Sequence, residues 1–241
     1  MKYSEFIFLG MKAGSDYGDP SMNYHSFLLG AANQQDFSSY LDKAFHEANV
    51  FLQRASSLGK FPTRIKEFPP MDENADLEMG SDFLKPVAVF QFSDGLRSSY
   101  NSLRFKKVGN NVQVVSPFSP NKEIYVQYRP KIRLFGKEDI VFIEPSNQNY
   151  ETTGESFIVR GTEYQSFADA FNAAEALQID LQNEYDIPDN LLMIGVDFIR
   201  ARLNDDVSRG HSQEMEAESR LNDFEQDEFL FVQTKGGRVA L

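Results

Sequence analysis

The residues that most often carry chemistry are few and scattered in this sequence. The three histidines are His25, His46 and His211, and no HExxH or comparable ligand spacing joins them. The sequence contains no cysteine, which excludes thiolate metal sites, cysteine nucleophiles and disulfides. It also lacks a GxSxG nucleophile elbow, a P-loop and a GxGxxG loop. These absences predict a protein that is not an enzyme and that has no cofactor and no metal.

Two acidic pairs could hold Mg²⁺, since carboxylate oxygens are ligands that this ion prefers. Asp139 and Glu144 lie on one predicted strand, and Asp205 and Asp206 lie at a predicted helix end. Their spacing is unspecific, and phosphodiester chemistry would also need a nearby lysine and a cationic route for the substrate. A solvated acidic surface is the favoured interpretation, and a metal-dependent nuclease is the weakest functional hypothesis.

One basic and aromatic segment could bind single-stranded nucleic acid. Arg104, Lys106 and Lys107 stand among aromatic residues of a predicted hairpin, and rings interleaved with cations are typical of such binding. Aromatic residues at a spacing of two are more often the core of a sheet. The net charge of −12 also argues against a surface that binds phosphate. DNA is therefore expected to pass this protein without sequence-specific binding.

Helical spacing of apolar residues predicts helices in both halves of the chain. The first covers 36–58, with Asp36 as its cap and Gly59 after its end, and the others lie within 166–225. The apolar face of the first helix is Phe37, Leu41, Ala44, Phe45, Ala48, Phe51, Leu52 and Ala55, and that of a later helix is Phe167, Ala170, Phe171, Ala174 and Leu177. Both helices are expected to pack on a core.

The segment 187–224 predicts an αα-hairpin. Pro188 suits the first turn of a helix, and Asp186 just before it could cap that helix. Polar residues at 204–206 break the apolar pattern between the two helices. The apolar face of the first helix is Leu192, Val196, Ile199 and Leu203, and the seam of the second, from about Val207, is Met215, Leu221 and Phe224.

Runs typical of β-strands lie between the two groups of helices. They are VAVFQF, RFKKV, VQVV, EIYVQYRP, IRLF, DIVFIE and FIVR, and Gly109, Asn110 and Asn111 form the predicted turn of a hairpin. The runs predict a small antiparallel β domain inserted at about 85–160. The preceding segment, 60–82, holds prolines and an acidic run, and it is predicted to be an exposed connector.

Both ends of the chain are predicted to be extended and to carry docking segments. An N-terminal arm over 1–35 contains Phe6, Ile7, Phe8 and Leu9. A C-terminal tail over 226–241 contains Phe229, Leu230, Phe231 and Val232. Because exposed apolar segments of this kind reduce solubility, each is expected to dock on its own domain or on a partner. The sequence leaves these two possibilities open.

The composition fits one large folded domain, with or without appendages. The chain has 241 residues, of which 41% are hydrophobic. The longest early apolar run, 6–9, is too short for a signal sequence or a membrane span, and no Asn-x-Ser/Thr acceptor occurs. A soluble, non-secreted protein without a membrane partner is expected.

The order of these segments resembles a known family. A first helix ends in LGKFPTRI, an aromatic hairpin follows as VGNNVQVV and IYVQYRPK, and IPDNLLMIGVDFIRARLNDD leads to the last helix, EMEAESRLNDF. Over residues 36–225 this arrangement is similar to the head–tail connector (adaptor, or neck ring) proteins of tailed bacteriophages, including short-tailed and crAss-like phages. The arm, the polar loop near Ser146 and the helix at Phe167 depart from the compact members of that family.

The resemblance implies an α+β fold in which the first and last helices form a helical bundle that carries the inserted β domain. It implies a homo-oligomeric ring of about twelve copies beneath the portal protein, in contact with adjacent tail or ring proteins, with DNA passing through the lumen. The expected location is the virion neck, after synthesis in the host cytoplasm. The alternative is a virion or scaffold protein that forms no ring.

Overall fold

A computed structural model describes residues 1–12, 23–30, 35–71, 75–93, 100–146, 156–204 and 207–224. The described residues have mixed α and β content, and their sheets are antiparallel. The chain divides into two compact units. We call Met1–Arg54 together with Leu134–Phe224 the helical unit, and Ala55–Arg133 the β unit.

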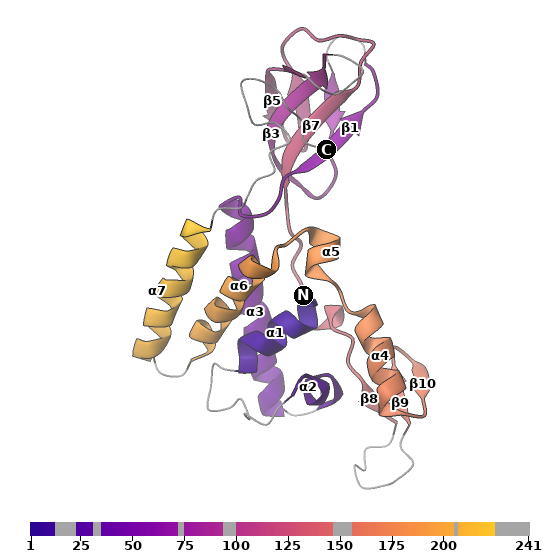
Figure 1. Cartoon of the computed structure of the whole chain (residues 1–241), viewed down its shortest axis with the longest axis vertical. Helices are drawn as coiled ribbons and strands as arrows, with labels where there is room; N and C mark the ends of the chain where they lie inside the picture. The colour runs from indigo at the N-terminus through magenta and orange to yellow at the C-terminus, as the bar shows by residue number, and fades with distance from the viewer. Residues whose placement is uncertain are drawn as a thin grey trace. The chain divides into compact units, whose positions relative to one another are not determined.

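Helices from both ends of the sequence come together in the helical unit (Figure 1). They are α1 (Tyr3–Lys12), α2 (Tyr24–Gly30), α3 (Gln35–Ser57), α4 (Phe167–Leu177), α5 (Leu181–Tyr185), α6 (Asp189–Leu203) and α7 (Val207–Asp223), with a 3₁₀ helix at Lys137–Asp139. α6 packs against α7, and α1 packs against α6. The αα-hairpin predicted over 187–224 is therefore formed. Within the described residues, no helix combines the length and the apolar character that crossing a membrane would require.

Three phenylalanines join α1, α3 and α6. The ring of Phe51 on α3 lies 6.5 Å from Phe6 on α1 and 5.8 Å from Phe198 on α6. All three are buried. Gly195 of α6 faces the first two rings, and a Cβ atom there would lie 2.6 Å from Phe51 and 2.8 Å from Phe6. The missing side chain is what allows the three helices to approach so closely.

The predicted apolar face of α3 is confirmed. Each of its members whose side chain is described is buried: Leu41, Ala44, Phe45, Ala48, Phe51, Leu52 and Ala55. Phe37 and the predicted cap Asp36 have side chains outside the described set. Gly59 follows the helix with a φ of +73°, and its N–H donates to the carbonyl of Ser56. This left-handed ending is the reason for a glycine at that position.

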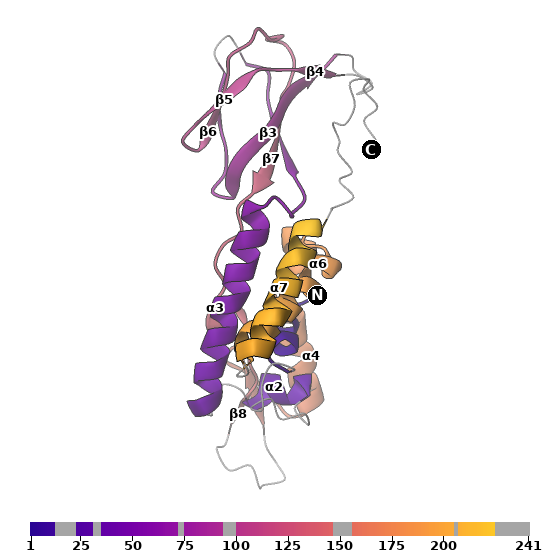
Figure 2. The ribbon, with the colours of Figure 1, turned by 90° about the vertical axis from the view of Figure 1, so that its left-hand side faces the viewer.

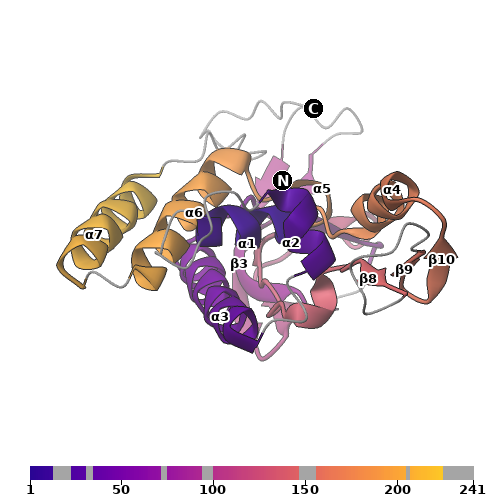
Figure 3. The same ribbon diagram turned by 90° about the horizontal axis from the view of Figure 1, so that it is seen from below.

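A small three-stranded sheet accompanies α4 (Figure 3). Its strands are β8 (Glu144–Pro145), β9 (Phe157–Val159) and β10 (Thr162–Tyr164), in the order β10-β9-β8. α4 begins where Ser166 accepts a hydrogen bond of 3.1 Å from the N–H of Asp169. The edge of Phe157 meets Phe167 at 5.6 Å. This sheet belongs to the helical unit. β8 and β9 lie in the segment that was predicted to form the inserted β domain, whereas β10 lies beyond that segment and was not predicted.

The β unit contains two antiparallel sheets (Figure 2). The larger has the order β1-β7-β3-β4, and its strands are β1 (Arg64–Phe68), β7 (Ile124–Pro130), β3 (Phe83–Phe92) and β4 (Tyr100–Ser102). The smaller has the order β2-β6-β5, and its strands are β2 (Asp76–Glu78), β6 (Asn111–Val114) and β5 (Phe105–Val108). The predicted hairpin is β5 and β6, with Gly109 at a φ of +60° in its turn.

The two sheets of the β unit share one hydrophobic core. Alternate residues of β7 enter it, because side chains in a strand point to opposite faces in turn. The buried members are Phe68, Ala75, Leu77, Met79, Phe83, Val89, Leu103, Val112, Val114, Ile124, Val126 and Tyr128. The β unit starts earlier than predicted, because β1 and β2 lie in the segment 60–82 that was predicted to be a connector.

Two predicted strands are wrong. IRLF is not a strand, and in DIVFIE only the last residue, Glu144, enters β8. Amide side chains replace strand partners there: Asn49 accepts from Phe135 N–H at 2.9 Å and donates to its carbonyl at 2.7 Å. Gln178 does the same for Val141, at 3.2 and 2.8 Å. The backbone groups of Phe135 and Val141 are thereby satisfied while the side chains of these two residues remain buried.

The ends of α6 and α7 also differ from prediction. Pro188 precedes α6 as its N-cap residue, and Asp186 is the left-handed C-cap of α5 and does not cap α6. The predicted face of α6 is confirmed, since all four of its members are buried. On α7, Leu221 is buried, but Met215 is 59% exposed. Ala217 and Gly210 take the inward positions, and a Cβ atom at Gly210 would lie 2.8 Å from the carbonyl oxygen of Ala201 on α6.

Candidate functional site

The predicted docking segment near the N-terminus is part of the protein's own core. Phe6, Ile7 and Phe8 are buried in α1, and Leu9 is half-buried. Phe8 packs on Phe27 of α2 at 5.5 Å. The structure therefore corrects the prediction of an extended arm, since residues 3–12 and 24–30 form helices. Phe6, Ile7 and Phe8 pack within their own chain and are unavailable to a partner, whereas Leu9 is only half-buried. A short apolar run looks the same in an arm and in a buried helix.

The second predicted docking segment, Phe229, Leu230, Phe231 and Val232, lies outside the described residues, as does the rest of the tail at 226–241. The same holds for Asp205 and Asp206, one of the two acidic pairs. Predictions for these residues remain predictions.

The remaining candidates for chemistry do not come together. Among the described residues, no group of three or more His, Asp or Glu could hold a metal ion. His25, His46 and His211 are all exposed, and the edge of His25 packs on Phe171 at 4.2 Å. Asp139 accepts from the N–H of Gly136 at 2.8 Å at the start of the 3₁₀ helix, whereas Glu144 is exposed on β8.

The basic hairpin residues divide between the two faces of the small sheet. Lys107 lies over the ring of Phe83 at 5.2 Å and donates to the carbonyl of Leu84. Arg104 and Lys106 are exposed. Phe105 packs partly buried against the core of the β unit. The aromatic ring of this strand therefore contributes to packing, and all three cations, Lys107 included, are exposed.

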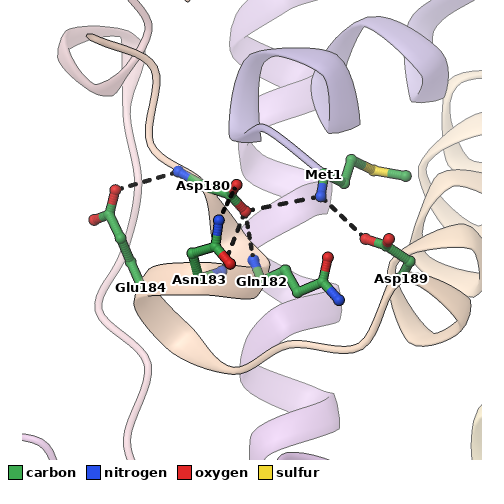
Figure 4. Close-up of polar contacts among 6 residues, drawn as sticks. All are labelled: Met1, Asp180, Gln182, Asn183, Glu184 and Asp189. Atoms are coloured by element: carbon green, nitrogen blue, oxygen red, sulfur yellow. Dashed lines mark hydrogen bonds and ion pairs between the residues drawn. The ribbon is translucent and has the colours of Figure 1, made fainter. Parts of the chain in front are cut away.

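A cluster of polar contacts holds the start of the chain (Figure 4). The N-terminal ammonium of Met1 lies 3.0 Å from Asp189 Oδ1 and 3.8 Å from Asp180 Oδ1. Asp180 caps α5, since its Oδ1 accepts from the N–H groups of Gln182 and Asn183. Leu181 N–H donates to the carbonyl of Met1 at 3.1 Å. These bonds fix α1 against the starts of α5 and α6.

The environment of Asp180 lowers the pKa of its carboxyl group. Burial alone would raise this pKa, but the N–H groups of Asn183 and Gln182 and the positive charge of the Met1 ammonium favour the ionised form and outweigh that effect. The opposite case is Tyr24 of α2, where burial raises the pKa of the hydroxyl well above its usual range. The carboxylate of Asp180 is therefore a structural anchor. Neither Asp180 nor Tyr24 lines the cleft found among the described residues.

Ion pairs attach α7 to its neighbours. Arg202 of α6 lies 3.0 Å from Glu214 of α7 and 3.8 Å from Glu47 of α3, and Arg54 of α3 pairs with Glu218. Few side chains of α7 are buried, and these half-exposed pairs add to its packing on α6, although each such pair contributes little to stability by itself. A helix held in this way is a candidate surface for contact with another protein.

A shallow cleft between α6 and α7 is lined by charged groups. Its lining residues are Asp197, Arg200, Gln213, Glu216, Ala217 and Arg220. Asp197 pairs with both Arg200 and Arg220. The Nε of Arg200 is enclosed and has no hydrogen-bond partner. The positive charges of Arg200 and Arg220 equal the negative charges of Asp197 and Glu216. The net charge of the cleft is therefore zero and would not attract a ligand of either sign.

Charge is unequally divided between the two units. The β unit, 55–133, contains 12 Lys and Arg against 8 Asp and Glu, a net charge of +4. The helical unit, 1–54 and 134–224, contains 10 Lys and Arg against 25 Asp and Glu, a net charge of −15. The net charge of the whole chain, −12, does not show this difference between the units. A separate count of charged residues over the inserted segment would show it from the sequence.

Comparisons with known proteins find no match: no protein-family model, no curated protein and no solved structure is similar to this chain at a significant level.

Proposed function

We propose that this chain is a structural subunit of a tailed-phage virion, in which copies form a ring in the neck between portal and tail. The proposal rests on the resemblance of segment order over residues 36–225 and includes no catalytic role. In it, the helices from the two ends of the chain form the ring's helical bundle and the β unit is the inserted domain that this bundle carries.

The observation that carries the proposal is the division of charge between an acidic helical unit and a basic inserted unit. A closed ring needs two different surfaces on each copy, which meet head to tail. Oppositely charged units supply such a pair, since the +4 unit of one copy attracts the −15 unit of the next. The surplus of negative charge on the helical unit also suits a channel for DNA, because phosphates do not adhere to a surface of like charge.

The contacts beyond the ring are with the portal protein and with adjacent tail or ring proteins. Few side chains of α7 are buried, and its exposed Met215 together with Met193 of α6 offers adaptable apolar contact. DNA passes through the lumen without sequence-specific binding. The expected location is the virion neck, with synthesis in the host cytoplasm.

Native mass by light scattering tests the proposal, alone and after mixing with the portal and neighbouring virion proteins of the same source. A mass of about twelve copies, or co-elution with the portal, is the expected result. A chain that stays monomeric beside all of these proteins would overturn the ring and favour an interaction or scaffold protein that forms none. Addition of Mg²⁺, Mn²⁺ or Zn²⁺ should leave the melting temperature and added DNA unchanged.

A further inference from the structure

The smaller sheet of the β unit, whose strands β5 and β6 are labelled in Figure 2, has one face outside the core. Val112 and Val114 of β6 enter the core, so the residues next to them in the strand point to the opposite side. β2 and β5 both pair with β6, so the side chains in the same rows point the same way. Val115 N–H donates to the carbonyl of Arg104 at 2.8 Å, which extends the pairing by one residue. The side chains on this side, which we call the outer face, are Asp76, Glu78, Arg104, Lys106, Val108, Asn111, Gln113 and Val115.

The charges of the outer face are separated by strand. The cations Arg104 and Lys106 lie along the β5 side, the carboxylates of Asp76 and Glu78 lie on β2, and all four side chains are exposed. The register places Lys106 opposite Gln113, and Gln113 opposite Asp76. The outer face is therefore positive along one side, neutral in the middle and negative along the other side.

Lysine side chains stand at both edges of this sheet. Lys66 of β1 donates a hydrogen bond of 2.8 Å to the carbonyl of Glu78 on β2. Lys107 of β5 donates to the carbonyl of Leu84 on β3. Lysines at the edge of a sheet disfavour the addition of a further strand. The outer face, and not an edge, is therefore the surface that this sheet offers to a partner.

We propose that the outer face packs on the outer face of a second copy of this chain, related by a two-fold axis parallel to β6. Packed sheets keep their strands within about 30° of each other, so this axis places β5 of one copy over β2 of the other. Lys106 then faces Asp76 of the second copy, and the same contact occurs twice because a two-fold contact is reciprocal. Gln113 lies on the axis, where its amide donates to and accepts from the same amide of the second copy.

Charge complementarity favours a second copy over a partner of one sign. An acidic partner, nucleic acid included, is attracted to the β5 side and repelled by the β2 side, and a basic partner meets the reverse. A matching partner must carry both charges in the opposite order, and a copy turned about the two-fold axis does so by symmetry. Val108 and Val115, which are 53% and 52% exposed, add apolar contact to this face. The contact uses the β unit alone and does not depend on ring formation.

Crosslinking across the axis tests the contact, and the absence of cysteine from the chain leaves no competing thiol. We would introduce Gln113→Cys in the full chain and add a short bis-maleimide, because packed sheets are about 10 Å apart and a disulfide would not span them. The control is Gln182→Cys, which places a thiol at an exposed glutamine of the helical unit. Denaturing electrophoresis measures the yield of crosslinked dimer.

The expected yield of dimer is at least about tenfold greater for Gln113→Cys than for Gln182→Cys, because the two-fold axis brings identical thiols together. Equal yields from the two variants, or no dimer from either, would overturn the proposal.

Two charge reversals in the Gln113→Cys protein separate pairing across the face from the effect of net charge. Lys106→Asp makes a chain of net charge −12 more acidic, and Asp76→Lys makes it less acidic. If net charge controlled association, these two changes would act in opposite directions. The proposed contact predicts that each lowers the yield of dimer by at least about tenfold, because each places like charges opposite one another twice.

The combination of the two reversals should restore the dimer. Lys106→Asp with Asp76→Lys exchanges the charges, so opposite charges again face each other and the yield should return to within about threefold of the starting protein. Both residues are exposed, so the melting temperature should stay nearly unchanged in all three variants. A combined variant that crosslinks no better than the single reversals would contradict the contact.

This contact and the proposed ring are tested separately. A large closed oligomer in light scattering, without a crosslink at Gln113, would disprove the two-fold contact alone. Crosslinked dimers of a chain that forms no ring beside its portal would disprove the ring alone.

Discussion

The close packing of α1, α3 and α6 depends on the missing side chain of Gly195. Gly195→Ala would place a Cβ atom against the rings of Phe51 and Phe6, at 2.6 and 2.8 Å. Both rings are buried and cannot move aside freely, so we expect the free energy of unfolding to fall by about 1–3 kcal/mol. Urea unfolding measures this change.

The control for that substitution lies on the same helix. Met193 is exposed, and Met193→Ala should change the free energy of unfolding by less than about 0.5 kcal/mol. A Gly195→Ala protein as stable as the wild type would mean that α1, α3 and α6 can separate without cost.

Asp180 makes stability depend on pH. Its pKa in the folded protein is below the ordinary value of 3.8, so its charge stabilises the fold fully above that value. The stabilisation is lost as the pH falls through the folded pKa, because the carboxyl group then takes up a proton in both states. Asp180→Asn keeps a capping oxygen and removes the charge, whereas Asp180→Ala also removes the cap.

At about pH 6 we expect Asp180→Ala to cost about 1 kcal/mol and Asp180→Asn to cost less. The difference in melting temperature between the wild type and Asp180→Asn should shrink as the pH falls to about 2. Thermal unfolding at several pH values measures both effects. A difference that does not change with pH would show that the charge of Asp180 contributes nothing.

At the scale of elements, buried coil takes the place of two expected strands. Ile140, Val141 and Ile143 are buried, yet Val141 pairs with the side chain of Gln178 and not with a strand. Gln178→Ala would leave the N–H and carbonyl of Val141 unpaired in the interior, which costs about 1–3 kcal/mol. Gln182 is exposed on α5, and Gln182→Ala is the matched control. Equal stability of the two variants in urea would contradict the role of Gln178.

At the scale of the whole molecule, the division of charge predicts how copies associate. Arg104→Glu with Lys106→Glu reverses two exposed cations of the β unit and should weaken self-association by at least about tenfold. Salt should weaken association of the wild-type protein, since the screening length falls from about 10 Å at 0.1 M to about 3 Å at 1 M. Sedimentation at several salt concentrations measures both effects.

A control variant makes the same change in net charge on the helical unit. It tests whether the effect depends on where the charges lie. Lys43 and Lys137 are exposed in the helical unit, and Lys43→Glu with Lys137→Glu makes that unit more acidic. This variant should not weaken association through the β unit. If both double variants weaken association equally, net charge alone controls it and the attraction between units is wrong.

The sequence by itself determined the elements whose pattern is local. The bounds of α3, the position of α4, the hairpin of β5 and β6, and the α6–α7 pair follow from apolar spacing and a glycine at each of two turns. These signals lie within a few residues of the structure they specify, so tertiary contacts had little to add.

Which secondary structure is formed by the apolar runs without a clear period depends on tertiary contacts. Phe6–Leu9 became a buried helix because α3 and α6 offer a surface that Gly195 keeps open. The residues around Val141 became coil because Gln178, 37 positions away, satisfies its backbone. In each case the deciding partner is distant in sequence, and burial of apolar surface is non-directional, so the local pattern could not specify the outcome.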